Sequence, residues 1–162
     1  MSITIREYVE ADKTQVAAWL EELQDYLIKL DPDNRLRRQP EYGEVFSKRL
    51  FHFIAEGQGK IYLAMNENRA VGFVAGAVDK QTYQNLLEIN PTKLGVISAL
   101  FVDEAFRGKG IGSQLMKKIE KYFTDLDCDS LWVNIVAFNP AHEIYQKFGF
   151  HDREIGMLKK II

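Results

Sequence analysis

Apolar residues recur at the spacing of an amphipathic helix in two stretches of the first third of the chain. The first stretch begins at Asp12, which has Gln15 at the capping-box position, and ends before Pro32. Its apolar positions are Val16, Trp19, Leu20, Leu23, Leu27 and Leu30. The second stretch lies between Pro40 and Ala55. Its apolar side consists of Tyr42, Val45, Phe46, Leu50, Phe53 and Ile54. We therefore predict two helices in this part of the chain.

Strand-like patterns surround these helices. Residues 2–9 alternate apolar and polar positions, and the runs at 60–67 and 70–79 flank a polar turn, which predicts a hairpin. The run LGVISALFV at 94–102 is almost wholly apolar, as is typical of a strand buried on both faces. Between these strands, residues 80–93 fit either a loop or a short helix around YQNLLEI.

The last third of the chain continues this mixture of helices and strands. A glycine-rich turn leads into a helix that we expect to end near Asp125. A strand follows at 130–138, then a short helix over PAHEIYQKF that Gly149 ends, and finally a strand at 154–162. No repeat or linker divides the sequence. We therefore expect residues 1–162 to form one domain of the α+β (layered α/β) class around a mixed sheet.

Composition narrows the possible partners. The 162 residues carry a net charge of −2, which gives no electrostatic case for nucleic acid. The basic run RLRRQ at 35–39 is mixed with Asp31 and Asp33, so we interpret it as a solvated loop. No apolar run is long enough to span a membrane, and the first residues lack signal-peptide features. With Cys128 as the single cysteine, we expect a cytoplasmic protein with neither nucleic acid nor membrane as a partner.

The glycine-rich run VDEAFRGKGIGS at 102–113 is the main candidate for chemistry. A strand that enters a helix through glycines exposes the free N–H groups of the first helical turn, and the helix dipole favours an anion there. Glycine also removes the Cβ that would keep a phosphate away from those amides. Arg107 and Lys109 add positive charge at the rim. The pattern predicts a phosphate or pyrophosphate site, with a plain strand-to-helix turn as the alternative.

Two common nucleotide motifs fit this run poorly. The P-loop pattern G-x-x-x-x-G-K-[ST] is absent, which argues against ATP or GTP. The dinucleotide pattern G-x-G-x-x-G would place its third glycine at Ser113, and it is expected in the first βαβ unit rather than after a hairpin. A dinucleotide-binding oxidoreductase therefore stays a distant alternative.

A family resemblance refines the anion site. The run RGKGIG, with Val102 five residues before Arg107, resembles motif A of the GNAT superfamily of N-acetyltransferases, V-x-x-x-x-[RQ]-x-x-G-x-[GA]. The later run YQKFGF is similar to that superfamily's Y-x-x-x-G-F signature. The order of elements also resembles the family over essentially the whole chain. The resemblance implies a mostly antiparallel central sheet with helices on both faces and splayed strands at 94–102 and 130–138.

The resemblance also implies a binding site for acetyl-coenzyme A, the co-substrate of the family, without a metal. The family binds the pyrophosphate with the amides of the glycine turn and the pantetheine arm with the backbone of the preceding strand. The corresponding positions are Leu100, Phe101 and Val102 on the strand and Arg107, Gly108, Lys109, Gly110, Ile111, Gly112 and Ser113 in the turn. The apolar side chains on the strand fit a core role equally well, because only the backbone is needed for the contact.

Tyr145 matches the family's general acid. Family members transfer the acetyl group directly from sulfur to an amine nitrogen, and a phenol with a pKa of about 10 can protonate a thiolate whose acid has a pKa of about 8.5. A packed aromatic residue on an amphipathic helix is the structural alternative. The resemblance therefore implies an N-acetyltransferase that acts on a primary amine of a small molecule, as a monomer or homodimer. A peptide or protein amine is the alternative acceptor.

Three features depart from the family or stay open. Asn139 is a plausible counterpart of the asparagine that bonds the cofactor arm, but it lies six rather than seven residues before Tyr145, and it fits a helix cap equally well. Ser98 replaces the strand glutamate that often serves as the base, so no base can be assigned. This loss keeps a non-catalytic, acyl-coenzyme-A-binding regulatory module as an alternative. The resemblance places the acceptor at roughly 19–46 together with the segment 80–93, and this region mixes both signs of charge.

Overall fold

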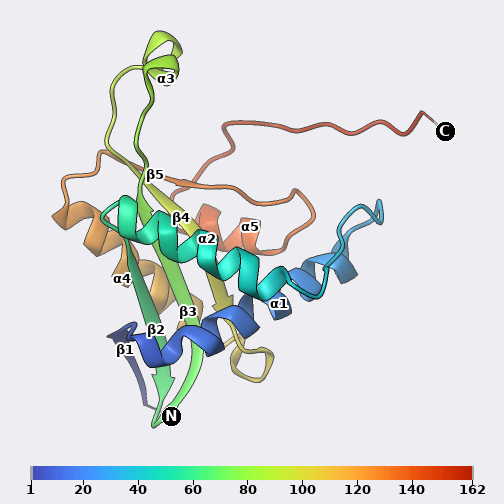
Figure 1. Cartoon of the computed structure of the whole chain (residues 1–162), viewed down its shortest axis with the longest axis vertical. Helices are drawn as coiled ribbons and strands as arrows, with labels where there is room; N and C mark the ends of the chain where they lie inside the picture. The colour runs from blue at the N-terminus through green and yellow to red at the C-terminus, as the bar shows by residue number, and fades with distance from the viewer. Residues whose placement is uncertain (1, 162) are drawn as a thin grey trace.

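The computed structural model describes residues 2–161 and contains one five-stranded sheet (Figure 1). The strands are β1 (Ile3–Glu7), β2 (Lys60–Asn66), β3 (Arg69–Val78), β4 (Leu94–Val102) and β5 (Ser130–Val133), in this spatial order. The first four strands pair antiparallel, and β4 pairs parallel with β5. The predicted hairpin is confirmed as β2 and β3. The mixed sheet and the helices around it confirm the predicted α+β class.

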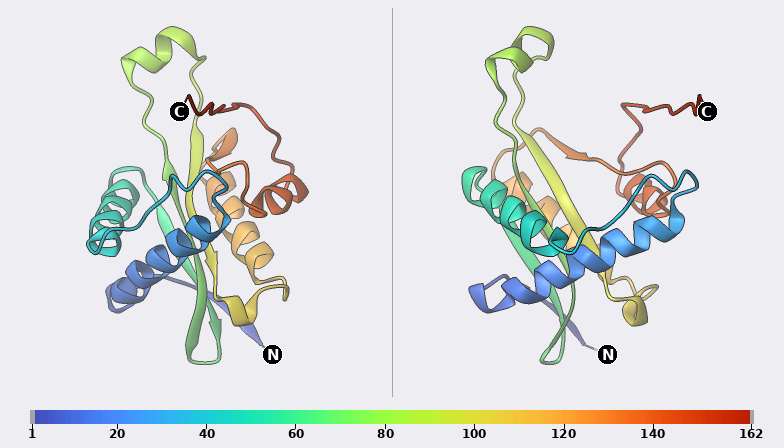
Figure 2. Two further views of the ribbon diagram at one scale, coloured as in Figure 1. Left: turned by 90° about the vertical axis from the view of Figure 1, so that its right-hand side faces the viewer. Right: turned by 45° about the vertical axis from the view of Figure 1, so that its right-hand side comes forward.

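One face of the sheet is covered by the two N-terminal helices, α1 (Lys13–Leu30) and α2 (Tyr42–Glu56) (Figure 2). Trp19 of α1 lies at the centre of this layer, stacked on Phe73 of β3 at 5.6 Å and tilted against Phe101 of β4 at 5.8 Å. Both helices were predicted from their apolar spacing. Val45 and Phe46, however, are 55% and 40% exposed, because they face a hollow between α1 and α2 rather than the sheet.

Asp12 precedes α1 as expected, but its carboxylate does not cap the helix. A short 3-10 turn over Glu10–Asp12 comes first, and the Asp12 carboxylate accepts two hydrogen bonds of 2.7 Å from the Arg6 guanidinium. It also accepts the N–H of Val9 at 2.9 Å. The predicted capping interaction is therefore replaced by an ion pair to β1, since a charged bidentate partner binds a carboxylate more strongly than a helix amide does.

The opposite face of the sheet is covered by α4 (Ile111–Asp125), whose buried side chains belong to a second apolar cluster. Ile111, Leu115, Met116, Ile119 and Phe123 are at most 1% exposed. The short helix α5 (Ala141–Lys147) contributes Tyr145 to the same cluster. The predicted end of α4 near Asp125 is confirmed, and the glycine turn is thereby fixed at the entrance to a fully packed helix.

A β-bulge in β4 separates two halves of that strand. Ala99 pairs with Ala75 of β3, whereas Ile97 pairs with the next residue, Gly76, so Ser98 is the extra residue. Ile97 belongs to the cluster under α4, while Ala99 and Phe101 belong to the cluster under α1. A bulge turns the following side chains to the other face of a sheet. The prediction of a strand buried on both faces is thus corrected: buried and half-buried residues alternate, and Ser98 is exposed.

The strand predicted at 130–138 is shorter than expected. Pairing with β4 runs only from Leu94 opposite Ser130 to Ile97 opposite Val133, and it stops where the bulge begins. Because the bulge bends β4 away, residues 134–138 have no neighbouring strand to pair with. The predicted splayed strands are present as β4 and β5, with the opening after Val133.

The strand predicted at 154–162 is wrong for residues 154–161, which form neither helix nor strand; Ile162 lies outside the described residues. The segment runs away from the sheet as an extended chain (Figure 1). A strand needs a neighbour to satisfy its N–H and C=O groups, and this segment has none within the described part of the chain.

Residues 79–93 form an arm that projects from one end of the sheet and carries α3 (Tyr83–Glu88) at its tip (Figure 1). The base of the arm is held by Asp129, whose carboxylate accepts hydrogen bonds from the Thr92 hydroxyl and from the N–H of Lys93. Tyr83 and Leu87 are 73% and 67% exposed. Of the two readings left open by the sequence, the short helix is the one observed.

Candidate active site

The glycine-rich turn leaves the end of β4 and enters α4 through two left-handed residues. A short 3-10 turn over Glu104–Phe106 comes first, and Gly108 and Gly110 then adopt φ values of +74° and +76°. Non-glycine residues rarely adopt this region. A Cβ built on either glycine would meet no atom within 4 Å, so backbone conformation, rather than packing inside the chain, requires glycine at both positions.

The turn presents a row of unused backbone donors. Within residues 2–161, none of the six N–H groups from Gly108 to Ser113 donates a hydrogen bond, while the N–H of Arg107 before them is bonded to the carbonyl of Glu104 at 3.2 Å. The first regular helical bond is donated by Gln114 to the carbonyl of Gly110 at 3.1 Å. Amides at the positive end of a helix dipole bind anions. The geometry therefore fits the predicted phosphate or pyrophosphate site.

Gly112 has no structural reason to be glycine. It lies in the first turn of α4 with helical geometry, and a Cβ there would have only an ordinary contact of 3.9 Å with Val102. Glycine within a helix costs about 0.5–1 kcal/mol relative to alanine. A small residue at this position, glycine or alanine in motif A, leaves room beside the amides of the turn for a bulky anion.

The two basic side chains of the turn are tied back to the protein. Arg107 donates from Nε to the carbonyl of Val102 at 3.0 Å, and its guanidinium lies over the Tyr26 ring at 4.7 Å. Lys109 donates to the carbonyl of Ala105 at 2.9 Å and lies over Phe106 at 4.9 Å. Their charges stay at the rim of the turn. Tyr26 was not expected in this role, because its sequence position shows only that it lies on a helix.

Leu100, Phe101 and Val102 lie in the half of β4 beyond the bulge. Their backbone pairs with β3 on one side and has no strand partner on the other side. Phe101 is buried, and Leu100 and Val102 are half-buried against the cluster under α4. The predicted core role of these side chains is therefore confirmed. The backbone of the same residues also has one edge without a strand partner.

Tyr145 is a buried ring whose hydroxyl has no partner among the described residues. The residue is 5% exposed and packs edge-on against Phe150, with ring centroids 5.6 Å apart. Burial raises the pKa of its phenol to about 12. The residue also lines a large hollow of about 1670 Å³ that extends along β5 and residues 134–137. Tyr145 thus lines the hollow beside β5 and residues 134–137, and its phenol is protonated at neutral pH.

Asn139 has the helix-capping role that the sequence left open. Its side-chain oxygen accepts the N–H of Ala141 at 3.0 Å, and its backbone carbonyl accepts the N–H of His142 at 3.0 Å. The side-chain NH₂ group makes no hydrogen bond within residues 2–161 and is free to donate. His142 is bonded through Nε2 to Asp152 at 2.6 Å, which ties α5 to the segment that follows it.

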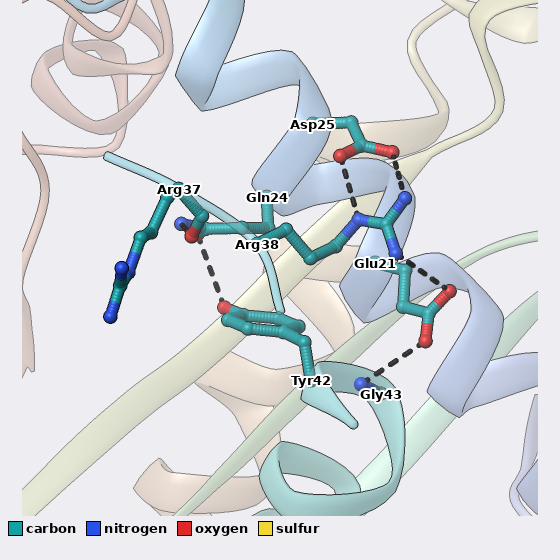
Figure 3. A network of polar contacts seen from close by, with 7 residues as sticks. All are labelled: Glu21, Gln24, Asp25, Arg37, Arg38, Tyr42 and Gly43. Carbon is teal, nitrogen blue, oxygen red and sulfur yellow. Dashed lines mark hydrogen bonds and ion pairs between the residues drawn. The ribbon is translucent and has the colours of Figure 1, made fainter. Parts of the chain in front are cut away.

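The acceptor region between α1 and α2 is held by a network around Arg38 (Figure 3). The guanidinium of Arg38 bonds both oxygens of Asp25, at 2.7 and 3.0 Å, and approaches Glu21 at 3.5 Å. This pairing lowers the pKa of Asp25. Glu21 also accepts the N–H of Gly43 at 3.1 Å. Arg38 thus binds both Asp25 and Glu21, and its single positive charge offsets one of their two negative charges.

Asp31 is engaged in the same way by backbone donors. Its carboxylate accepts the N–H groups of Asp33, Arg35 and Leu36 at 3.0, 2.6 and 2.8 Å. These bonds, that of Leu36 foremost, lower the pKa of Asp31. The loop from Asp31 to Glu41 is thereby fixed at its start, and Gln24 holds its middle by donating to the carbonyl of Arg37 at 3.0 Å.

Two arginines of this loop have no partner among residues 2–161. Arg35 and Arg37 make no side-chain hydrogen bond or ion pair there, and both line a hollow of about 470 Å³ beside the stacked rings of Tyr42 and Phe46. The two rings lie 4.0 Å apart. The sequence shows Arg35, Arg37 and Arg38 but not which of them forms an ion pair, because that depends on the fold.

Residues 2–161 contain neither a candidate metal site nor a helix suited to a membrane. No group of three or more histidine, cysteine, aspartate or glutamate side chains is placed to hold a metal ion. In the same residues, no helix combines the length and apolar character needed to cross a bilayer.

Comparison with known proteins identifies relatives over most of the chain. The model of the acetyltransferase (GNAT) family matches residues 16–150. The chain is 29% identical over 96 residues to an uncharacterised N-acetyltransferase of Methanocaldococcus jannaschii, covering 58% of this chain and 54% of the relative. It is 32% identical over 91 residues to a putative phosphinothricin acetyltransferase of Bacillus subtilis, covering 56% and 52%. The chain thus spans about half the length of these curated relatives.

A solved structure extends the likeness to the whole fold. A putative acetyl transferase of Pyrococcus furiosus has a TM-score of 0.76 at 23% identity, with 99% of this chain and 100% of that chain covered. This likeness concerns the fold: the same order of strands and helices recurs in a protein of similar length.

Proposed function

Because the chain belongs to the GNAT family of acetyltransferases, we propose that it transfers an acetyl group from acetyl-coenzyme A to a primary amine of a small molecule, with Tyr145 as the general acid. One observation carries this proposal: six unused N–H groups at the start of α4 lie beside the open half of β4. A pyrophosphate-bearing ligand with an extended arm matches both features. A peptide or protein amine is the second candidate acceptor.

The residues present fit acetyl-coenzyme A, which would supply the activated acetyl group. The amides of Gly108–Ser113 bind the pyrophosphate, and Arg107 and Lys109 add positive charge at the rim. The free edge of Leu100–Val102 bonds the arm through backbone groups, as an added strand would. The free NH₂ group of Asn139 is a further donor toward the arm, compatible with its capping role.

Tyr145 holds a proton at its phenol oxygen for the departing thiolate. The raised pKa of this phenol, about 12, keeps it protonated at neutral pH, as an acid must be before it acts. No partner among the described residues competes for the hydroxyl. This arrangement favours a catalytic reading over that of a purely regulatory module, because an unbonded phenol hydroxyl in the wall of the hollow is free to donate its proton.

The acceptor is best matched by a small amine that is not a polycation. Glu21 and Asp25 are paired with Arg38, and Asp31 is bonded by backbone amides, so the region offers few free carboxylates to several ammonium groups. The unpaired Arg35 and Arg37 favour an amine that also bears a carboxylate or phosphate. Ser98 supplies no base, so the acceptor must lose its proton to water or have a low pKa itself.

Two measurements test this function. Thermal unfolding is followed with coenzyme A, acetyl-coenzyme A, NAD and ATP, because a ligand at 100 times its Kd stabilises the native state by about 2.7 kcal/mol. We expect a shift with both forms of coenzyme A; a shift with NAD alone would identify a dinucleotide-binding protein instead. An acetylation screen over amines and peptides then finds the acceptor. Binding without any acetyl transfer would support the regulatory module.

A further inference from the structure

The side of α1 that packs on the sheet continues toward the glycine-rich turn. Trp19 lies on this side and is tilted against Phe101 of β4, with ring centroids 5.8 Å apart. Tyr26 follows seven residues later, which is about two helical turns and therefore the same side of the helix. Figure 2 shows α1 crossing the sheet at the end of β4 that leads into the turn. Tyr26 thus belongs to the part of α1 that lies beside the turn.

The ring of Tyr26 is half-buried but contributes to neither apolar cluster within residues 2–161. Its hydroxyl makes no hydrogen bond in the same range. The ring instead contacts Arg107, whose guanidinium carbon lies 4.7 Å from the ring centroid. The negative face of an aromatic ring attracts a cation placed over it. The ring therefore has its partner in the turn rather than in the core.

Arg107 is held at three points. Its Nε donates to the carbonyl of Val102 at 3.0 Å. Its guanidinium lies over the Tyr26 ring and also 5.9 Å from the ring centroid of Phe101. The two terminal nitrogens make no hydrogen bond within residues 2–161. Because a stacked guanidinium keeps the donors in its own plane available, these two nitrogens can bind an anion while the ring holds the face.

The held guanidinium lies where the two parts of the candidate cofactor site meet. Val102, which accepts its Nε, is the last residue of the open half of β4. Gly108, the residue after Arg107, begins the row of unused N–H groups. A fixed arginine loses less side-chain entropy on binding than a mobile one, and charge-assisted hydrogen bonds to phosphate are strong. The arrangement therefore suits a phosphate at the start of the row.

We propose that Tyr26 is a positioning residue of the cofactor site, which holds the Arg107 guanidinium so that its two terminal nitrogens bind the phosphates of coenzyme A. The inference rests on the proposed function, since it requires the glycine-rich turn to bind the pyrophosphate. Tyr26 acts through Arg107 and does not itself contact the phosphates. The helix α1 thereby contributes to the cofactor site as well as to the acceptor region.

The first test measures the Kd for coenzyme A by calorimetric titration. Tyr26→Leu removes the ring and is expected to raise this Kd about three- to tenfold, because the guanidinium is no longer held. Tyr26→Phe keeps the ring and loses only the hydroxyl, so its Kd is expected to equal that of the wild-type chain.

Phe51→Leu is the matched control. Phe51 is a half-buried ring of the layer under α1 and also has a cation over it, with Nζ of Lys13 5.8 Å from the centroid. Lys13 is the first residue of α1, at the end of the helix away from Tyr26. This variant is expected to bind coenzyme A with unchanged affinity.

The outcomes separate this inference from the proposed function. If the wild-type chain binds coenzyme A and Tyr26→Leu binds it equally well, the positioning role is rejected alone. A wild-type chain that does not bind coenzyme A would reject the proposed function, and the positioning role with it. A Kd raised as much in Tyr26→Phe as in Tyr26→Leu would show that the hydroxyl acts rather than the ring, and would also reject the proposal.

A double-mutant cycle shows whether the ring acts through Arg107. Arg107→Met keeps a long side chain without its charge and is expected to weaken coenzyme A binding. Adding Tyr26→Leu to it is expected to change the Kd by less than about twofold, because the ring then has no cation to hold. Salt is expected to weaken binding more in the wild-type chain than in Arg107→Met, since it screens the charge on the phosphates. A packing defect in α1 would lower the affinity equally in both backgrounds, and that result would overturn the proposal.

Discussion

The turn between β4 and α4 uses glycine for two different reasons, backbone conformation and open space, and only open space applies to Gly112. Gly108 and Gly110 have positive φ values, whereas Gly112 has helical geometry and room for a methyl group. We expect Gly112→Ala to raise the free energy of unfolding by up to about 1 kcal/mol, since alanine is the better helix former. The same variant is expected to keep its coenzyme A affinity, because motif A accepts alanine at this position. Gly112→Leu is expected to weaken coenzyme A binding at least about tenfold, because its larger side chain crowds the amides of the turn. Urea unfolding and calorimetric titration measure the two effects.

Gln114→Leu is the matched control for Gly112→Leu. Gln114 is exposed in the same helical turn, and its N–H is already bonded to Gly110. This variant is expected to leave coenzyme A affinity unchanged. If Gly112→Leu bound coenzyme A as tightly as the wild-type chain, the pyrophosphate site could not lie against these amides.

Tyr145→Phe tests the assigned acid. The ring and its contact with Phe150 are kept, and only a hydroxyl without a partner among residues 2–161 is lost. Removal of a general acid typically lowers kcat by about 10²–10⁴-fold. We expect such a fall with the Kd for acetyl-coenzyme A unchanged. Equal turnover by the variant and the wild-type chain in steady-state assays would remove Tyr145 from the mechanism.

The raised pKa of Tyr145 also makes a prediction about stability. The unfolded phenol ionises at a pKa of about 10, while the folded phenol keeps its proton up to about 12. The group therefore contributes stability in full below pH 10, and the contribution is lost as the pH rises through about 12. Relative to Tyr145→Phe, the wild-type chain is expected to lose stability between pH 8 and pH 11. Urea midpoints at the two pH values measure this, and a constant difference would contradict it.

Some of these side chains could be assigned from sequence and others could not. The amides of Gly108–Ser113 were predictable, because local sequence alone sets a strand–glycine–helix turn. The role of Asn139 was not, since capping and ligand binding use the same residue type. The charge of the acceptor region depended on which arginine reaches Asp25 across 13 positions of sequence, and no local pattern contains that information.

Among the secondary-structure elements, the helices were predicted better than the outer strands. An amphipathic helix satisfies its own backbone and shows its period in sequence, so α1, α2 and α4 were found with ends close to those observed. A strand depends on its neighbour. The shortening of β5 and the unpaired segment 154–161 follow from neighbours that are bent away or absent within the described chain, which composition does not reveal.

The loop from Asp31 to Glu41 is tied to α1 by Arg38, beside the bonds that Asp31 and Gln24 make to its backbone. Arg38→Gln removes its contacts with Asp25 and Glu21 while keeping a side chain of similar length. We expect faster amide exchange in residues 35–39 and a KM for the acceptor amine raised several-fold, with the KM for acetyl-coenzyme A unchanged. Lys48→Gln removes an exposed ion pair with Glu44 and serves as the control. An unchanged acceptor KM in Arg38→Gln would place the acceptor elsewhere.

At the scale of the whole molecule, we expect coenzyme A to slow amide exchange at a defined set of residues. The amides of Gly108–Ser113 have no hydrogen bond inside the described chain, so they are expected to exchange rapidly without ligand. Coenzyme A is expected to slow them at least about tenfold under conditions where the bound form dominates. Residues 98–102 on the open half of β4 are protected with them, and the loop at 31–41 is unaffected. Hydrogen–deuterium exchange with single-residue resolution makes the measurement, and uniform protection of the whole chain would contradict a site at this turn.

The bulge at Ser98 decides whether the opening between β4 and β5 is present. The fork between β4 and β5 depends on the number of residues in β4, since one extra residue ends the pairing and exchanges the two faces of the strand. Any residue type could occupy the extra position without closing the fork. Deletion of Ser98 would leave Ile97 opposite Gly76 and Ala99 opposite Ala75, and it would remove the irregularity that ends the pairing of β4 with β5. The opening therefore depends on the number of residues in β4. A substitution of the extra residue keeps the opening, whereas its deletion removes it.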